Sequence, residues 1–265
     1  MTTSSEQSAA GENHQLSAAI EAAQSLGRAL GECPVFRRFD AAYEALQADP
    51  EAQQKLGEFH NRRREFDIAS TQGEVDNNEQ EQLECAWQDL MTMPALNEYV
   101  QAQRELRALF QQVTGMISEE IDIDYGAVCS PPGARSFSGA DTARLSLDGC
   151  ENVLRGADEF ICALESTPVV RHYAEAAQRF ETDPEVQAFM EMLQHFEKMQ
   201  QNGEVPDEQL QRLREAQTRI QSHPAVVEFL DARDAAAGFL QQTNQVISQI
   251  LGLDFGRTAG PAAGY

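Results

Sequence analysis

Residues 117–126 of this chain have the sequence ISEEIDIDYG, and residues 247–256 have the related sequence ISQILGLDFG, 130 positions later. A second landmark repeats upstream of each stretch. The segment 34–50, which begins Pro-Val and ends Asp-Pro, returns as segment 168–184 at an offset of 134. A period this long indicates two copies of one domain rather than a solenoid of short repeats. We therefore predict a tandem duplication whose two halves pack against each other, as two copies do in a homodimer.

Each copy has the apolar spacing of amphipathic helices. Between residues 16 and 30, apolar side chains recur at steps of three and four, which places them on one face of a helix. Asp49-Pro50 is typical of a helix start, because Asp accepts hydrogen bonds from free N–H groups and Pro has no N–H to leave unsatisfied. The arm that follows and its return through Pro94 have a seam close to the heptad pattern. The predicted fold is all-α, with two tandem helical-hairpin repeats that form an internal pseudo-dimer.

Changes in composition divide the chain into five segments. Residues 1–14 are polar and predicted to be disordered, and residues 15–126 form the first repeat. Residues 127–147 contain Pro, Gly and Ser clusters and are predicted to be a linker before the second repeat, residues 148–256. Residues 257–265 are small and predicted to be a disordered tail. The second copy is four residues shorter between its Asp-Pro pair and its Gly-Glu-Val turn, so the hairpin tips should differ.

The charge balance is strongly acidic, with 20 basic and 43 acidic residues and a net charge of −23. Such a surface repels phosphate backbones, so we do not expect direct binding to nucleic acids. A basic partner would be attracted, although a solvated acidic surface is the simpler interpretation. No run of about 18 apolar residues is present, so no membrane span is expected. The N-terminal residues lack the basic and apolar regions of a secretory signal, and we predict a cytoplasmic protein.

The spacings that metal and phosphate chemistry require are absent from the sequence. None of the five histidines has Glu three positions before it, as a carboxylate-bridged di-metal bundle needs. Neither His-Glu-x-x-His nor a phosphate-binding glycine loop occurs. The pair Glu119-Glu120 is interpreted as part of a solvated face. Asp124 and Asp254 recur in both copies and are predicted to have a structural role in a turn or cap. We therefore predict that the chain is not an enzyme.

Five cysteines are scattered without a Cys-x-x-Cys spacing, which indicates reduced thiols. Cys33, Cys85 and Cys162 lie inside helical patterns and are expected to be buried. Cys129, near the linker, is the candidate for a reactive or metal-binding thiol, with Cys150 also nearby.

Arg62, Arg63 and Arg64 form the basic cluster of this acidic chain, and the second copy has no such cluster. The fold therefore does not need it. It is a candidate site for docking an acidic partner or RNA, and the alternative is that it balances neighbouring acids.

These landmarks together resemble the YlbF/YmcA-type regulators of bacteria over residues 16–126 and 150–256. The resemblance is carried by Ala48-Asp49-Pro50, the turn Gly73-Glu74-Val75, the Pro-punctuated return helix and the Ile-Asp-Tyr-Gly ending. It implies an all-helical, non-enzymatic protein that binds other proteins. Members of the family are associated with competence, sporulation and biofilm control, and some join a complex with iron–sulfur clusters that assists an endoribonuclease in mRNA maturation. This chain differs in being a tandem fusion and in lacking a Cys-rich C-terminal tail.

The primary hypothesis is a cytosolic regulatory or adaptor protein that acts through protein–protein contacts in RNA processing or developmental control. Family-like subunits or a ribonuclease are the expected partners. No cofactor is expected, and an iron–sulfur cluster would need thiols from a partner together with Cys129. Two alternatives stay open: a redox or iron–sulfur-linked sensor subunit, and a structural coiled-coil-like spacer. If the two halves pair as in a homodimer, isolated residues 1–130 should self-associate.

Overall fold

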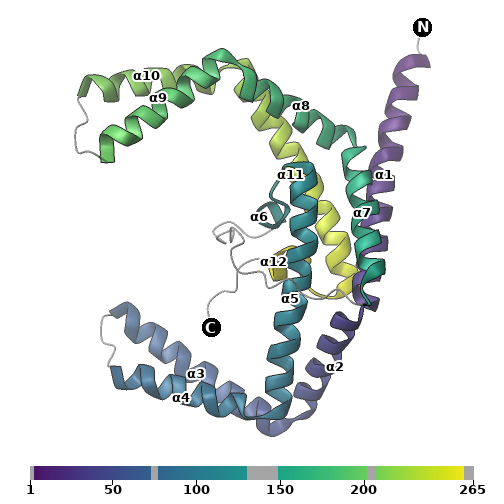
Figure 1. The fold of residues 1–265 in the computed structure, drawn as a ribbon, viewed down its shortest axis with the longest axis vertical. Coiled ribbons are helices and arrows are strands. Elements are labelled where there is room, and N and C mark those ends of the chain that lie inside the picture. Colours follow the sequence, from purple (N-terminus) through teal and green to yellow (C-terminus); the bar gives the residue numbers. More distant parts are fainter. Residues whose placement is uncertain (1–2, 73–76, 130–148, 202–206, 260–265) are drawn as a thin grey trace.

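The computed structural model describes residues 3–72, 77–129, 149–201 and 207–259, and these residues form helices and no strand (Figure 1). Within this part of the chain each copy contributes six helices in the same order. None of them is long and apolar enough to cross a membrane. The prediction of an all-α tandem repeat is confirmed. The helices of the first copy are α1 (Thr3–Glu32), α2 (Pro34–Ala48), α3 (Pro50–Gln72), α4 (Asn77–Met91), α5 (Pro94–Ile121) and α6 (Tyr125–Cys129), and those of the second are α7 (Glu151–Glu165), α8 (Pro168–Thr182), α9 (Pro184–Gln201), α10 (Asp207–Gln221), α11 (Pro224–Leu251) and α12 (Phe255–Ala259).

The helix starts follow the capping signals of the sequence. One carboxylate oxygen of Asp49 accepts hydrogen bonds from the N–H groups of Glu51 and Ala52, at 3.1 and 3.0 Å. Asp183 does the same for Glu185 and Val186 at 2.9 and 3.2 Å. The predicted Asp-Pro caps are therefore confirmed in both copies.

The two copies are intertwined rather than merely adjacent. Helix α1 packs against α7 and against α11, the long helix of the other copy, and α7 packs against α5 in the equivalent way. The short helices cross over as well, since α6 contacts α11 and α12 contacts α5. This exchange is the pseudo-dimer that the sequence predicts.

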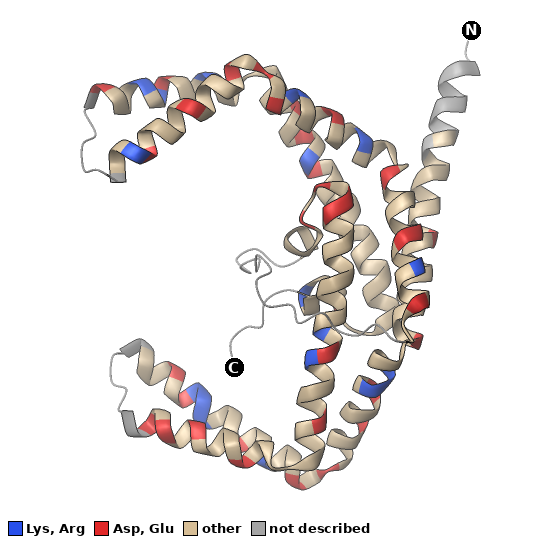
Figure 2. Ribbon diagram, in the orientation of Figure 1, with Lys and Arg blue, Asp and Glu red and all other residues tan. Residues whose placement is uncertain are grey.

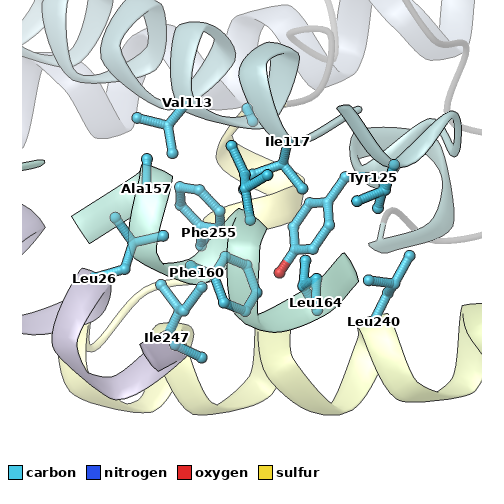
Figure 3. Close-up of a cluster of buried hydrophobic side chains, with 14 of the residues drawn as sticks. Leu26, Val113, Ile117, Tyr125, Ala157, Phe160, Leu164, Leu240, Ile247 and Phe255 are labelled. Atoms are coloured by element: carbon cyan, nitrogen blue, oxygen red, sulfur yellow. The ribbon is translucent and has the colours of Figure 1, made fainter. Parts of the chain in front are cut away.

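One hydrophobic core results from this exchange (Figure 3). Phe110 of the first copy meets Phe255 of the second edge to face, with ring centroids 4.9 Å apart. Tyr125 and Phe160 form a second such pair at 6.3 Å. All four side chains are fully buried. Neither copy therefore has a complete core of its own.

The predicted antiparallel hairpins are present as α3 with α4 and α9 with α10, and both project to the same side of the core (Figure 1). Helix α9 has 18 residues against 23 in α3, so the hairpins differ in length as expected. The turns at 73–76 and 202–206 lie outside the described residues.

The return arm is not continuous, which corrects the expectation of one long arm. Met93 is extended and Pro94 occupies the first position of α5. Because Pro lacks the N–H that would continue α4, the chain bends there, and α5 leaves the hairpin to pack on α2 and α7.

Helices extend into three segments that were expected to be irregular. Helix α1 begins at Thr3, within the segment 1–14 predicted to be disordered. Ala, Glu and Gln in this segment are good helix formers, and the anchored helix beyond Leu16 removes the cost of nucleation. Residues 127–129 belong to α6 rather than to the linker, and residues 257–259 belong to α12 rather than to the tail. The rest of these two segments, residues 130–147 and 260–265, lies outside the described residues.

The repeated ISxxxxxD motif forms the turn between each long helix and the short helix after it. Asp124 accepts a hydrogen bond from the N–H of Ala127 at 2.8 Å, and Asp254 accepts one from Arg257 at 3.0 Å. The hydroxyl oxygens of Ser118 and Ser248 accept hydrogen bonds from the backbone N–H groups of Tyr125 and Phe255, at 2.9 and 3.0 Å. The structural role predicted for the two aspartates is confirmed, as N-caps of α6 and α12.

Substituting Gly252 by Ala should lower the free energy of unfolding by about 1 kcal/mol, because its φ of 67° ends α11 in the left-handed conformation. Gly238, in the same helix, has open space around it, and Ala there should stabilise by about 0.5–1 kcal/mol. Urea denaturation of both variants checks this pair. If both substitutions changed the free energy of unfolding in the same direction, the assigned backbone conformations would be wrong.

Candidate functional site

A groove with a volume of about 890 Å³ lies in the first copy, where the hairpin and α5 diverge. Its walls come from α2, α3, α4 and α5, and we call it the first-repeat groove. It is lined mainly by aromatic and aliphatic side chains, among them Tyr43, Phe59, Phe66, Trp87, Tyr99 and Val100. A volume of this size falls in the range of ligand-binding pockets.

The bend at Pro94 creates this groove. A small buried core that includes Leu46, Phe59 and Leu96 holds the base of the bend together. Farther out, the side chains are only partly covered because α5 no longer follows the hairpin, and Tyr43 is 44% exposed. The aromatic rings hold one another in place, with centroid distances of 5.4 Å for Phe59–Trp87 and 6.0 Å for Tyr43–Tyr99. The result is a preformed apolar surface open to solvent.

Arginines from two walls give the groove a basic character. Arg63 on α3 lines it with Asp67, which lies 3.8 Å away. Arg104 and Arg107 line it from α5, and neither forms a salt bridge with any residue in the described part of the chain. The Nε of Arg107 is buried without a hydrogen-bond partner there. Figure 2 shows basic positions on both α3 and α5, in a chain that is otherwise rich in acidic ones.

The nearby acids of α5 already have a partner. Arg38 on α2 binds Glu98 at 2.7 Å and Glu105 at 2.6 Å. Its hydrogen bond to Glu98 raises the pKa of Arg38 and lowers the pKa of Glu98. These two salt bridges hold α2 against α5. Because Glu98 and Glu105 already pair with Arg38, they are not the partners of Arg104 and Arg107.

The second copy replaces the residues that give the groove its chemistry. At the offset of 130, Trp87 corresponds to Gln217, Arg104 to Asp234 and Arg107 to Ala237. At the offset of 134, Tyr43 corresponds to Ala177. Since both copies have the same helices, the fold does not require these residues, and a role in binding is the better explanation.

The predicted docking cluster is divided between faces of α3. Arg63 lines the first-repeat groove, whereas Arg62 lies beside Lys55 and Asp89 on another face, and Arg64 is exposed. Successive residues of a helix point about 100° apart, so three consecutive arginines cannot share one surface. Arg63, which lines the groove, was named from the sequence, but Arg104 and Arg107, which only a comparison of the two copies would have singled out, were not.

Cys129 lies partly buried in α6, where its thiol donates a hydrogen bond to the carbonyl oxygen of Leu240 at 3.7 Å. Burial raises the pKa of this thiol to about 12, which favours the neutral form over the thiolate that binds metals. The described residues contain no cluster of three or more His, Cys, Asp or Glu side chains placed to hold a metal ion. A cluster completed by partner thiols stays a prediction.

Two of the three cysteines expected to be buried are exposed. Cys33 is buried, but Cys85 and Cys162 are not. On α7 the neighbouring Ile161 and Leu164 take the core-facing side, so Cys162 points outward. A single Cys in a helical pattern does not determine which face the helix buries.

Replacing Cys129 by Ala should reduce the loss of stability at alkaline pH. The thiol's pKa rises from its ordinary value of 9.0 to about 12 on folding. Below about pH 9 both states are protonated and the stability is unaffected; between about pH 9 and 12 only the unfolded state ionises, so stability falls as pH rises. Urea denaturation at about pH 8 and about pH 10.5 should show that the wild type loses about 1–2 kcal/mol more than Cys129→Ala.

The second copy supports this choice of variant, because Ala259 occupies the equivalent position and is buried. Cys85→Ala, which removes a thiol at an exposed site, is the matched control for the substitution. Equal pH dependence in the wild type and Cys129→Ala would contradict the burial of a neutral thiol.

Comparison with known proteins places both copies in one family. The profile of a family described as control of competence regulator ComK, YlbF/YmcA, matches residues 19–122 and 153–251. A UPF0342 protein of Symbiobacterium thermophilum is 33% identical over 103 residues, which are 38% of this chain and 92% of that protein. A UPF0342 protein of Caldicellulosiruptor saccharolyticus is 28% identical over 102 residues, 38% of this chain and 85% of that protein. No solved structure matches the chain.

The two profile matches fall on the two copies, and each relative is covered almost entirely by a segment about one repeat long. The family is a regulatory one, linked to control of ComK. This chain therefore belongs to the YlbF/YmcA family and carries the family's unit twice.

Proposed function

We propose that this chain is a non-enzymatic, cytoplasmic regulatory adaptor that acts by binding other proteins, with the first-repeat groove as its docking site. The observation that carries the proposal is the groove itself, a preformed surface whose aromatic and arginine side chains at positions 43, 87, 104 and 107 are not repeated in the second copy. Its aromatic and arginine side chains are the types enriched in protein interfaces. The regulatory character of the family supports the same role.

The process that this adaptor serves is proposed to be RNA processing or a developmental pathway, with family-like subunits or a ribonuclease as partners. The proposal of this process and of these partners rests only on the membership of the chain in the YlbF/YmcA family. The acidic surface of the chain, with a net charge of −23, favours contact with proteins over direct contact with RNA.

Anaerobic affinity purification of the tagged chain from its native cell, with mass spectrometry and an absorbance spectrum of the eluate, tests the proposal. The expected result is a defined set of co-purifying proteins that is lost from the variant Tyr43→Ala/Trp87→Gln. This variant introduces the residues of the second copy, so the fold should tolerate it. Recovery of the chain alone would contradict the adaptor role. A brown eluate would favour the iron–sulfur-linked sensor instead.

A further inference from the structure

We propose that the first-repeat groove binds an amphipathic helix of a partner protein, whose apolar side chains cover the aromatic base and whose acidic side chains pair with Arg104 and Arg107. This inference rests on the proposed function and specifies the chemistry of the partner.

The walls of the groove favour a helix over an extended peptide. They are helices whose backbone groups bond within themselves, so they offer no strand edge to a β-strand. An occupant that buries its backbone against an apolar base must satisfy its own N–H and C=O groups, which a helix does.

The length of the groove suits a short helix. The lining residues run from Leu56 to Asp67 along α3 and from Leu96 to Arg107 along α5. At about 1.5 Å per residue each wall is roughly 15 Å long, which corresponds to about three turns of a bound helix. Apolar anchors at positions i, i+3, i+4 and i+7 of such a helix would lie along the base.

Charge complementarity indicates that the partner helix carries acidic side chains on the face that meets α5. Arg104 and Arg107 are three residues apart on α5 and therefore lie on neighbouring turns of one face. Both are without a salt bridge in the described residues, although acids outnumber bases 43 to 20 in the whole chain. The buried Nε of Arg107 has no acceptor there. Carboxylates on adjacent turns of a bound helix would supply acceptors to both guanidinium groups.

The opposite wall makes the arrangement directional. Glu84 on α4 also lines the groove, and Arg63 on α3 lies close to Asp67. The acidic stripe of the partner helix therefore faces α5, and its other flank, toward the hairpin, carries neutral or basic side chains.

Trp87 is the only tryptophan of the chain and lines the groove, so its fluorescence reports binding in the full-length protein. The probe is a synthetic amphipathic peptide of about 14 residues with Leu at i, i+3, i+4 and i+7 and Glu along one flank. Its twin has Lys in place of every Glu. The acidic peptide should bind at least about tenfold more tightly than the twin, and this preference should disappear in Arg104→Asp/Arg107→Ala.

Two further variants test whether the effect comes from the two groove arginines rather than from the net charge of the chain. Arg28→Ala/Arg37→Asp makes the same change in net charge at exposed residues outside the groove and should keep the acidic peptide's affinity within about twofold. Arg104→Gln/Arg107→Gln removes both positive charges but keeps polar, unbranched side chains, and it should also weaken binding of the acidic peptide. Equal affinity for both peptides, or quenching of Trp87 by single-stranded RNA or a fatty acid but not by the acidic peptide, would overturn the proposal.

The same variants distinguish this proposal from the proposed function. If the wild type and Arg104→Asp/Arg107→Ala recover the same partners from the native cell, the charged-helix proposal fails and the adaptor function stands. If neither recovers any partner, the adaptor function itself fails. Loss of a partner from this variant, together with its retention by Arg28→Ala/Arg37→Asp, supports both.

Discussion

Replacing Phe110 by Ala is expected to lower the free energy of unfolding by about 3–5 kcal/mol, the usual cost of removing a fully buried Phe. Phe110 has no exposed surface and contacts Phe255 of the other copy at 4.9 Å between ring centroids. The truncation therefore leaves a cavity at the junction of the two copies rather than within one of them. Urea denaturation, followed by circular dichroism and by Trp87 fluorescence, gives the change.

Phe110→Leu is the matched control, because the second copy has Leu240 at the equivalent position. It retains most of the buried apolar volume and should cost far less, about 1 kcal/mol. Since the core is shared, both probes should report one transition. A loss below about 1 kcal/mol in Phe110→Ala, or separate transitions for the two probes, would show that the copies have independent cores.

Residues 1–130, expressed alone, are expected to form a homodimer. In the full chain α1 packs on α7 and α11, and α5 packs on α7 and α12, so the isolated first copy loses all of these partners. Leu26, Phe110, Ile117 and Tyr125 would then face water. A second copy of the same segment offers equivalent helices, as in an isologous dimer. Sedimentation equilibrium should show a dimer at micromolar concentration, with helical content similar to that of the full chain.

The homodimer should be weaker than the natural pair of halves. In the homodimer Leu26 takes the place of Phe160, and Phe110 takes the place of Leu240, so the core is underpacked at one position and overpacked at the other. Adding a segment of residues 148–259 should therefore displace homodimer in favour of the mixed pair. The variant Ile117→Asp should abolish association by placing a charge in the interface. A folded, stable monomer of residues 1–130 would contradict the intertwined core.

The features that could be predicted from the sequence are those fixed by local chemistry. The Asp-Pro caps, the Asp124 and Asp254 turns and the hairpins follow from neighbouring residues and are present as expected. The bend at Pro94 has a local signal, but the departure of α5 from the hairpin does not. It depends on a competition between the hairpin seam and the core around Phe110, which spans both copies.

The candidate site was only partly predictable for the same reason. Arg63 was part of a visible cluster, whereas Arg104 and Arg107 are single residues in a polar stretch whose importance depends on which wall they line. Cys129 stood out by its position in the chain, yet its burial and its contact with Leu240 come from the other copy. Contacts between copies are set by tertiary packing, which periodicity alone does not reveal.

The fusion of two unlike copies also determines how many partner molecules one chain binds in the first-repeat groove. A homodimer displays every surface twice and gains avidity from a partner with two matching sites. Here Trp87, Arg104 and Arg107 occur once, since the other copy has Gln217, Asp234 and Ala237. Whatever occupies the groove is therefore bound once per chain, and its titration should end at a one-to-one ratio. A partner with two such helices would bind two separate chains. The complex would stop at that size, because neither chain has a second groove of this chemistry with which to bind another partner molecule.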